Sequence, residues 1–205
     1  FGINSLIAAG VCAWFLVPMF NGLSSISATS DIFPSSQYYA FNFAEFWAGH
    51  FSGVVPTVLS SDVSNAPNIA CGVLSILAFW LFIFDEKLSL KTKFAYLGGL
   101  VVLFISFYIG QIDFIWHAFH VPNDLPFRYS FVYSFLFVII AAYGLRSIKD
   151  IKPRYLIATA VMMGLSLLLL YLYSLKFENI TGKMVLLNVV VGIIYFLLII
   201  LSKYY

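Results

Sequence analysis

Charged side chains are scarce in this chain of 205 residues, because Asp, Glu, Lys and Arg together make up only 10% of it. Hydrophobic residues make up 62%. A soluble globular domain carries about 25% charged residues, so the composition excludes an ordinary soluble protein and indicates an integral membrane protein. The net charge of +2 is too small to favour binding to nucleic acid.

Several catalytic and metal-binding motifs are also missing. The chain has no Gly-rich phosphate loop, no Cys-x-x-Cys, no His-Glu-x-x-His and no nucleophile elbow. Cys12 and Cys71 lie in or beside apolar runs, so we expect two small buried residues and no disulfide or metal site. No acid or base lies in the middle of an apolar run, which disfavours a proton-coupled transporter or a channel with charged rings.

Six apolar runs are long enough to suggest membrane-spanning helices, each of which needs about 20 mostly apolar residues. They cover residues 3–20, 68–84, 94–112, 129–145, 155–174 and 184–202. The sequence therefore predicts an all-α, polytopic helical membrane protein with residues 1–205 in a single transmembrane domain. No basic segment precedes the first run, so we expect a span there and not a signal peptide, within a longer protein.

Basic residues are concentrated in alternate loops. Eight lie in loops 85–93 and 146–154 and in the C-terminal tail, whereas the other loops carry only Arg128, Lys176 and Lys183. The positive-inside rule therefore predicts that the basic loops and both chain ends are cytoplasmic. Region 21–67 and loops 113–128 and 175–183 would then face outward. We expect the cytoplasmic loops to be short solvated turns.

The outward region 21–67 has a dense aromatic stretch between residues 35 and 53. Such rings favour the headgroup layer of a membrane. Ser35 and Ser36 can cap a helix beginning near Gln37, so the sequence predicts a short helix along the membrane surface. Glu45 and His50 would lie on it, either as part of a site or simply hydrated at the interface.

Loop 113–130 carries most of the candidate chemistry. Asp113, His117 and His120 are spaced at i, i+4 and i+7, which places them on one helical face. This spacing leaves open a divalent cation as cofactor, although it is no specific metal signature. Arg128 lies at the start of the next span, where free backbone N–H groups and the helix dipole favour an anion such as a lipid phosphate. The alternative is that Arg128 only extends to the membrane interface.

Residues 116–135 resemble the YfhO family of bacterial membrane proteins. In both, Trp-His, Pro-Asn, aromatic-Arg and a Ser-Phe-x-x-Ser-Phe helix start follow in this order. The segment 66–72, with Pro67, Asn68 and Ile69, is similar to the Pro-Asn-Ile-Tyr-x-Gly segment of that family. The matched order covers roughly residues 1–145.

This resemblance implies a membrane protein of a Gram-positive bacterium, similar to GT-C type glycosyltransferases. Such proteins are implicated in decorating lipoteichoic acid or related cell-wall polymers outside the cell. The donor would be a sugar on undecaprenyl phosphate, supplied by a sugar-lipid synthase on the cytoplasmic side. Family members are much longer than this chain, and the outer loop with the key acid would lie upstream.

The candidate site residues follow from the charge pattern and the resemblance together. Candidates for substrate or phosphate binding are Arg128, His117, Asn123, Trp116 and Asn68. Candidates for the catalytic carboxylate are Asp31, Glu45 and Asp113, and weaker candidates are His50, His120 and Asp124. Other members can show Gln or an aromatic residue in place of His120 and Asp124, which weakens those two. A non-enzymatic partner that binds or flips the lipid-linked sugar for a separate transferase is the alternative function.

Overall fold

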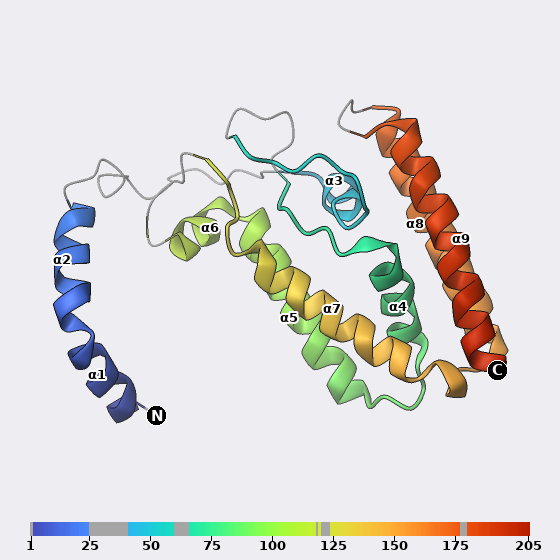
Figure 1. Cartoon of the computed structure of the whole chain (residues 1–205), viewed down its shortest axis with the longest axis horizontal. Coiled ribbons are helices and arrows are strands. Elements are labelled where there is room, and N and C mark those ends of the chain that lie inside the picture. Colours follow the sequence, from blue (N-terminus) through green and yellow to red (C-terminus); the bar gives the residue numbers. More distant parts are fainter. Residues whose placement is uncertain (1, 25–40, 60–65, 118, 120–123, 177–179) are drawn as a thin grey trace.

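Helices form the regular structure of the part of the chain that the computed structural model describes, residues 2–24, 41–59, 66–117, 119, 124–176 and 180–205 (Figure 1). The α-helices are α1 (Gly2–Val11), α2 (Ala13–Ser24), α3 (Phe43–Ala48), α4 (Gly72–Phe84), α5 (Leu90–Tyr108), α6 (Gly110–Trp116), α7 (Ser130–Arg146), α8 (Pro153–Ser174) and α9 (Gly182–Tyr204). A 3₁₀ turn, Ile148–Asp150, joins α7 to α8. In these ranges β-structure is limited to isolated bridges, so the predicted all-α fold is confirmed.

The apolar runs coincide with helices, but their lengths differ from the expectation. Within the described ranges, α5, α8 and α9 are long and apolar enough to cross a membrane. The pair α1 and α2, bent by 49°, would make a fourth span if it counts as one, and α4 and α7 are shorter apolar helices. Of the two cysteines, which are both free, Cys12 is exposed and Cys71 only half-buried, contrary to the expected burial.

Helix α4 is the centre of the bundle. It packs against α7, α8 and α9, and its side chains Val73, Ile76, Leu77 and Leu81 are fully buried or nearly so. Its 13 residues span only about 20 Å at 1.5 Å per residue, whereas the hydrocarbon core of a bilayer is about 30 Å thick. Other parts of the chain must therefore fill the space beyond the N-terminus of α4.

The segment after α3 fills that space. The carbonyl oxygen of His50 accepts hydrogen bonds from the backbone N–H groups of Cys71, at 3.2 Å, and Gly72, at 3.0 Å. This carbonyl satisfies two of the free N–H groups at the start of α4, which has no side-chain cap. Irregular backbone at this depth is acceptable because it is buried in protein.

Helices α4 and α7 cross at very close range. A Cβ atom built on Gly144 of α7 would lie 2.0 Å from the carbonyl oxygen of Ala78 in α4 and 2.9 Å from the backbone N of Phe82. Only glycine allows this approach of the two backbones. The crossing lies near the C-terminal end of α7, which ends at Arg146.

Helix α3 is a short helix that begins at Phe43. Its N-cap is Asn42, and Glu45 completes a capping box with it. Gln37 and the predicted caps Ser35 and Ser36 lie outside the described residues. In Figure 1, α3 is seen nearly end-on, whereas α8 and α9 run within the picture, so α3 lies across the long helices. Its residues Phe46 and Ala48 are buried, so packing holds this helix in place.

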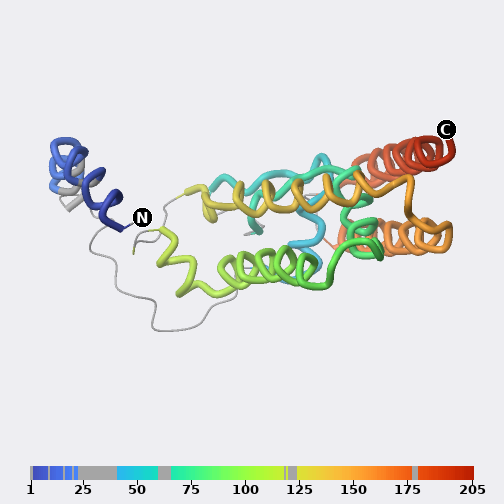
Figure 2. Tube along the Cα trace, turned by 90° about the horizontal axis from the view of Figure 1, so that it is seen from below, coloured from blue at the N-terminus to red at the C-terminus, as the bar shows by residue number. Residues whose placement is uncertain are grey.

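The span predicted at 94–112 is divided into two helices. The helix α5 ends at Tyr108, because Ile109 has an extended backbone with φ −101° and ψ 109°. The short helix α6 then turns away from the axis of α5, as Figure 2 shows. This break places Asp113 and His117 beside the start of α7.

The loops gather at two ends of the bundle. The α4–α5 loop, the α7–α8 connection and the C-terminus lie at one end, here called the basic end (Figure 1). Helices α3 and α6 and residues 124–129 lie at the other, here called the site end (Figure 1). This division agrees with the loop alternation predicted from the sequence, while the side of the membrane that each end faces remains a prediction.

Candidate functional site

Asp113 and His117 form a buried pair at the site end. Each is only 6% exposed. The Nδ1 atom of His117 lies 3.3 Å from Oδ1 of Asp113 and 3.0 Å from its carbonyl oxygen. One helical turn separates the two residues, which is the i, i+4 spacing predicted from the sequence. The third member of the predicted face, His120, lies outside the described residues.

Tyr129 completes this pair. Its hydroxyl group donates toward Oδ1 of Asp113 at 3.0 Å and lies 2.9 Å from the carbonyl oxygen of Ser106. Tyr129 is itself buried. The carboxylate of Asp113 therefore lies between a hydroxyl group and an imidazole, away from bulk water.

The charge of His117 is set by two opposing effects. Burial disfavours the charged imidazole, but the hydrogen bonds and the negative charge of Asp113 outweigh burial and raise the pKa of His117 above its usual 6.5. The positive charge of Arg128 acts in the opposite direction and limits the rise. Asp113 thus makes the imidazole of His117 more basic than usual, and the charge of Arg128 opposes this effect.

Arg128 lies on the surface, directly before the N-cap of α7. Its Nη2 donates to the carbonyl oxygen of Asp124 at 3.3 Å. Tyr129, the N-cap residue, makes no side-chain hydrogen bond to the first turn of α7. The positive end of the helix dipole and a guanidinium group therefore meet here, whereas the N–H groups of Ser130 and Val132 already donate to the carbonyl oxygens of Phe127, at 2.8 Å, and Tyr129, at 2.9 Å.

The backbone leading to Arg128 is strained. Leu125 and Phe127 have φ values of +53° and +56°, and Phe119 has +63°. Non-glycine residues rarely adopt this left-handed conformation, and such strain often accompanies a functional constraint. Phe127 is also buried, at 4% exposure. Packing of its ring compensates for the strain and fixes the direction of the Arg128 backbone.

Trp116 packs with one face of its indole ring on the buried Tyr129. Its ring is stacked on Tyr129 with centroids 4.8 Å apart and an interplanar angle of 15°. Tyr129 stacks in turn on Phe107 at 4.9 Å. Trp116 is still 49% exposed, so part of the indole is accessible beside His117.

A second group of predicted residues lines a cavity of about 190 Å³ beside α3. Its walls include Glu45 and Ala48 of α3, Thr57, Asn68 and Ile69 of the following segments, and Tyr173 of α8. Asn68 shapes this wall, because its Oδ1 accepts from the N–H of Thr57 at 2.9 Å and its Nδ2 donates to the carbonyl of Thr57 at 2.8 Å. Oε2 of Glu45 accepts from the N–H of Asn42 at 3.4 Å.

His50 belongs to the core and is not hydrated at an interface. It is fully buried, and its Nε2 lies 3.0 Å from the hydroxyl oxygen of Tyr133 in α7. Its Nδ1 lies 3.2 Å from the carbonyl oxygens of Phe46 and Trp47. Burial lowers the pKa of His50 from 6.5 to about 4, so the ring is neutral at pH 7. Its position indicates a role in holding α3 against α7.

The structure thus brings some candidates together and separates others. Asp113, His117, Trp116 and Arg128 surround the start of α7, whereas Glu45 and Asn68 line the cavity. Asp124 is held by its backbone, which forms an antiparallel bridge with Leu59. Asp31, His120 and Asn123 lie outside the described residues. Within the described ranges, no three His, Cys, Asp or Glu residues form a group that could hold a metal ion.

The comparison with known families assigns the chain to one of them. A family model described as "Bacterial membrane protein YfhO" matches residues 1–205. The chain belongs to the YfhO family. Neither the curated proteins nor the solved structures include a match to it. The resemblance stated on residues 66–72 and 116–135 is therefore confirmed over the whole length of this YfhO chain.

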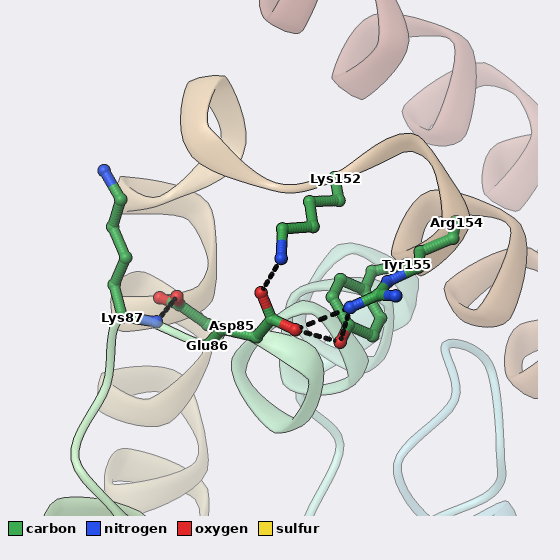
Figure 3. Close-up of polar contacts among 6 residues, drawn as sticks. All are labelled: Asp85, Glu86, Lys87, Lys152, Arg154 and Tyr155. Atoms are coloured by element: carbon green, nitrogen blue, oxygen red, sulfur yellow. Dashed lines mark hydrogen bonds and ion pairs between the residues drawn. The ribbon is translucent and has the colours of Figure 1, made fainter.

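The basic end of this YfhO chain carries a polar network between two loops that we expected to be solvated turns (Figure 3). Glu86 forms ion pairs with Lys152 and with Arg154, the latter at 2.7 Å, and accepts a hydrogen bond from Tyr155. The hydrogen bonds from Lys152, Tyr155 and Arg154 lower the pKa of Glu86 to about 2. Asp85 is buried, at 2% exposure, whereas the side chain of Glu86 is 45% exposed.

Further contacts extend this network. Lys87 pairs with Asp150 at 2.8 Å, and Nζ of Lys203 donates to the carbonyl oxygens of Lys149, at 3.3 Å, and of Ile151. The α4–α5 loop, the α7–α8 connection and the end of α9 are therefore joined at the basic end.

Sequence reasoning missed the tyrosines that contact Asp113 and His50 and that line the cavity in this family member. Tyr129, Tyr133 and Tyr173 stand in apolar runs and resemble ordinary interfacial aromatics in the sequence. A Tyr one residue after Arg128 and sixteen residues after Asp113 has no local pattern that would mark the contact of its hydroxyl group with a carboxylate.

Proposed function

We propose that this YfhO-family chain is part of a membrane glycosyltransferase. It would transfer a sugar from an undecaprenyl-phosphate donor to a cell-wall polymer such as lipoteichoic acid, outside a bacterial plasma membrane. The observation that carries this proposal is the convergence of Arg128 and His117 at the N-terminus of α7. The ring of His117 lies 5.7 Å from that of Tyr129, the N-cap residue of α7, which directly follows Arg128.

Two cations at a helix N-terminus suit a phosphate group. Transfer of the sugar leaves a lipid phosphate that carries increasing negative charge as the glycosidic bond breaks. Donors that are already in place stabilise this charge in the transition state. Arg128 would bind the phosphate oxygens through its guanidinium group, and His117, kept charged by Asp113, would provide a second cation.

The neighbouring residues support binding of a sugar next to that phosphate. The accessible part of the Trp116 ring lies beside His117, and an aromatic face is a suitable surface for the apolar face of a sugar ring. Asn123, between His117 and Arg128 in the sequence, remains a proposed contributor. Asp113 would act by holding His117 in place, because its own carboxylate is occupied by Tyr129 and His117.

The charge distribution supports the proposed orientation. The concentration of lysines and arginines at the basic end favours the cytoplasm for that end. Both chain ends would then be cytoplasmic, and the Arg128 group would face outward. A synthase on the cytoplasmic side would supply the lipid-linked sugar as partner enzyme. A divalent cation remains a proposed cofactor that only a metal-dependence assay can test.

The same cations would also suit a protein that binds or flips the lipid-linked sugar without catalysing transfer. The full-length protein purified into nanodiscs, with lipid-linked sugar and acceptor polymer as the only other components, distinguishes the two functions. Release of undecaprenyl phosphate with labelling of the polymer supports the transferase. Binding of the donor without any labelling supports the non-enzymatic alternative.

Substitution of Arg128 tests whether its guanidinium group binds the phosphate of the donor. We expect Arg128→Ala to lower the transfer rate about 10²–10³-fold, as the loss of one transition-state donor does in other enzymes. Arg128→Lys keeps the charge but not the paired N–H groups, so it should retain an intermediate rate. Because Arg128 is exposed, neither variant should change the melting temperature. A parental rate in a properly inserted Arg128→Ala variant would contradict this role.

A further inference from the structure

The cavity beside α3 contains polar groups that the phosphate-binding end does not use. Glu45, Thr57, Asn68 and Tyr173 contribute to its walls together with the backbone of residues 54–57 and 66–70. Its volume is about 190 Å³, which is room for about six water molecules at ~30 Å³ each. A hydroxyl-bearing unit of a few carbon atoms fits such a space, whereas a whole polymer does not.

Two contacts join the segments that flank this cavity to the loop that carries Arg128. Phe41, which precedes the N-cap of α3, packs edge-on against Phe127 with ring centroids 6.0 Å apart. Leu59, two residues beyond Thr57, forms the antiparallel bridge with Asp124, and Leu125 N–H donates to the carbonyl of Val58 at 2.7 Å. The chain directly before α3 and directly after Thr57 of the cavity wall therefore packs against the segment 124–128.

Glu45 is positioned to act in this cavity. It is half-buried, and the capping box with Asn42 limits the directions that its side chain can take. Asp113, the other candidate carboxylate that the structure describes, is buried against Tyr129 and His117. Of these two acids, only Glu45 borders a space that a substrate could enter.

We propose that the cavity binds the hydroxyl-bearing unit of the acceptor and that Glu45 takes the proton of the attacking hydroxyl group. This inference rests on the proposed transferase function and adds the acceptor subsite to it. In the step, the acceptor oxygen forms a bond to the anomeric carbon of the sugar while its proton moves to Glu45. The bond between that carbon and the phosphate oxygen breaks, and the lipid phosphate leaves with the electron pair beside Arg128.

The experiment combines transfer with mapping of the bound acceptor. The full-length protein in nanodiscs is incubated with lipid-linked sugar and with a short poly(glycerol phosphate) that carries a photoreactive diazirine. Crosslinked residues are identified by mass spectrometry. Glu45→Gln removes the carboxylate but retains a side chain that can complete the capping box. Val55→Trp fills the cavity from a residue that is 55% exposed. Asn42→Ala removes the side-chain cap on the N–H of Glu45 but keeps the backbone N–H of residue 42 that binds the Glu45 carboxylate.

We expect crosslinks on residues 45–57 and 66–70 in the parent. They should persist in Glu45→Gln, whose transfer rate should fall at least 10²-fold, and disappear in Val55→Trp. Asn42→Ala should retain most of the transfer. Crosslinks elsewhere, or parental transfer in Glu45→Gln, would overturn the inference.

Failure of the proposed function gives a different result. If the parent transfers no sugar but its crosslinks lie in the cavity and Val55→Trp removes them, acceptor binding is supported and the proton-transfer role is overturned together with the transferase function. If the parent transfers sugar and Val55→Trp changes neither transfer nor crosslinking, only the acceptor subsite is wrong.

Discussion

Asn188 of α9 holds Ser52 through both of its amide atoms. Oδ1 of Asn188 accepts from the backbone N–H of Ser52 at 3.1 Å, and Nδ2 donates to the carbonyl of Ser52 at 2.9 Å. Asn188 is 1% exposed. Asn188 thus fixes the irregular segment after α3, which supports both His50 and the cavity.

Asn188→Leu should therefore destabilise the protein and displace α3. Each buried backbone group that loses its partner costs about 1–3 kcal/mol, so a clear decrease in melting temperature is expected in detergent or nanodiscs. Leu187→Ala, at a 52% exposed position of the same helix, is the matched control. Equal melting temperatures of Asn188→Leu and the parent would mean that the hydrogen bonds between Asn188 and Ser52 do not contribute to stability.

Gly144→Ala should prevent the close crossing of α4 and α7. The added methyl group would lie 2.0 Å from the carbonyl oxygen of Ala78, so the two helices must separate. Overpacking of this kind costs about 1–3 kcal/mol or more. Gly98→Ala in α5 is the control, because nothing lies within 4 Å of its added Cβ. Thermal unfolding monitored by intrinsic fluorescence compares the two, and a larger loss in Gly98→Ala would refute the explanation.

His50 should make stability depend on pH. Its pKa in the folded state is about 4, below the ordinary 6.5, so the unfolded chain binds the proton more readily between these values. The stabilisation is fully present above pH 6.5 and is lost as the pH falls toward 4. Between pH 7.5 and pH 5 the loss corresponds to about 2 kcal/mol.

Comparison with His50→Gln isolates this effect from other titrating groups. His117 contributes with the opposite sign, because its raised pKa stabilises the protein at low pH and this contribution is lost as the pH rises through its folded value. The melting temperature of the parent should therefore fall more than that of His50→Gln between pH 7.5 and pH 5. Parallel curves for the two proteins would show that His50 does not titrate in this way.

Glu86→Gln should weaken the ion pairs that join the α4–α5 loop to the α7–α8 connection at the basic end. The lowered pKa of Glu86, about 2, means that its stabilisation is present above the ordinary value of 4.5 and is lost as the pH falls toward 2. At pH 7 the variant should melt at a slightly lower temperature than the parent. Because salt screens exposed ion pairs, the difference should decrease in 1 M NaCl. Lys183→Gln, an exposed charge at the start of α9, serves as the control, and a salt-independent difference would argue against an electrostatic origin.

Local patterns in the sequence predicted the parts of the site that depend on neighbouring residues. The i, i+4 spacing of Asp113 and His117 is local, and so is the position of Arg128 before a long apolar run. Both are found in the structure. The predicted start of the surface helix at Ser35, Ser36 and Gln37 lies outside the described residues, and α3 begins with the local capping box of Asn42 and Glu45.

Contacts between distant residues were not predictable in this way. His50 meets Tyr133 across 83 positions, and Asn188 meets Ser52 across 136. In spans that are apolar all round, no periodicity shows which face meets another helix and which meets lipid. The burial of His50 and the separation of Glu45 from Asp113 therefore could not be inferred.

The sequence by itself determined that this protein is a helical membrane protein, that its basic loops gather at one end and that Arg128 stands at the head of a helix. These features depend on composition, charge counts and short spacings. Only the tertiary structure decided that Asp113 is enclosed by Tyr129 and His117 and that Glu45 borders a cavity. The physical reason is that α4 is too short to cross a bilayer, so the segments around α3 are packed between the longer helices. A polar side chain that is buried there needs a hydrogen-bond partner, and the packing determines which residue that partner is.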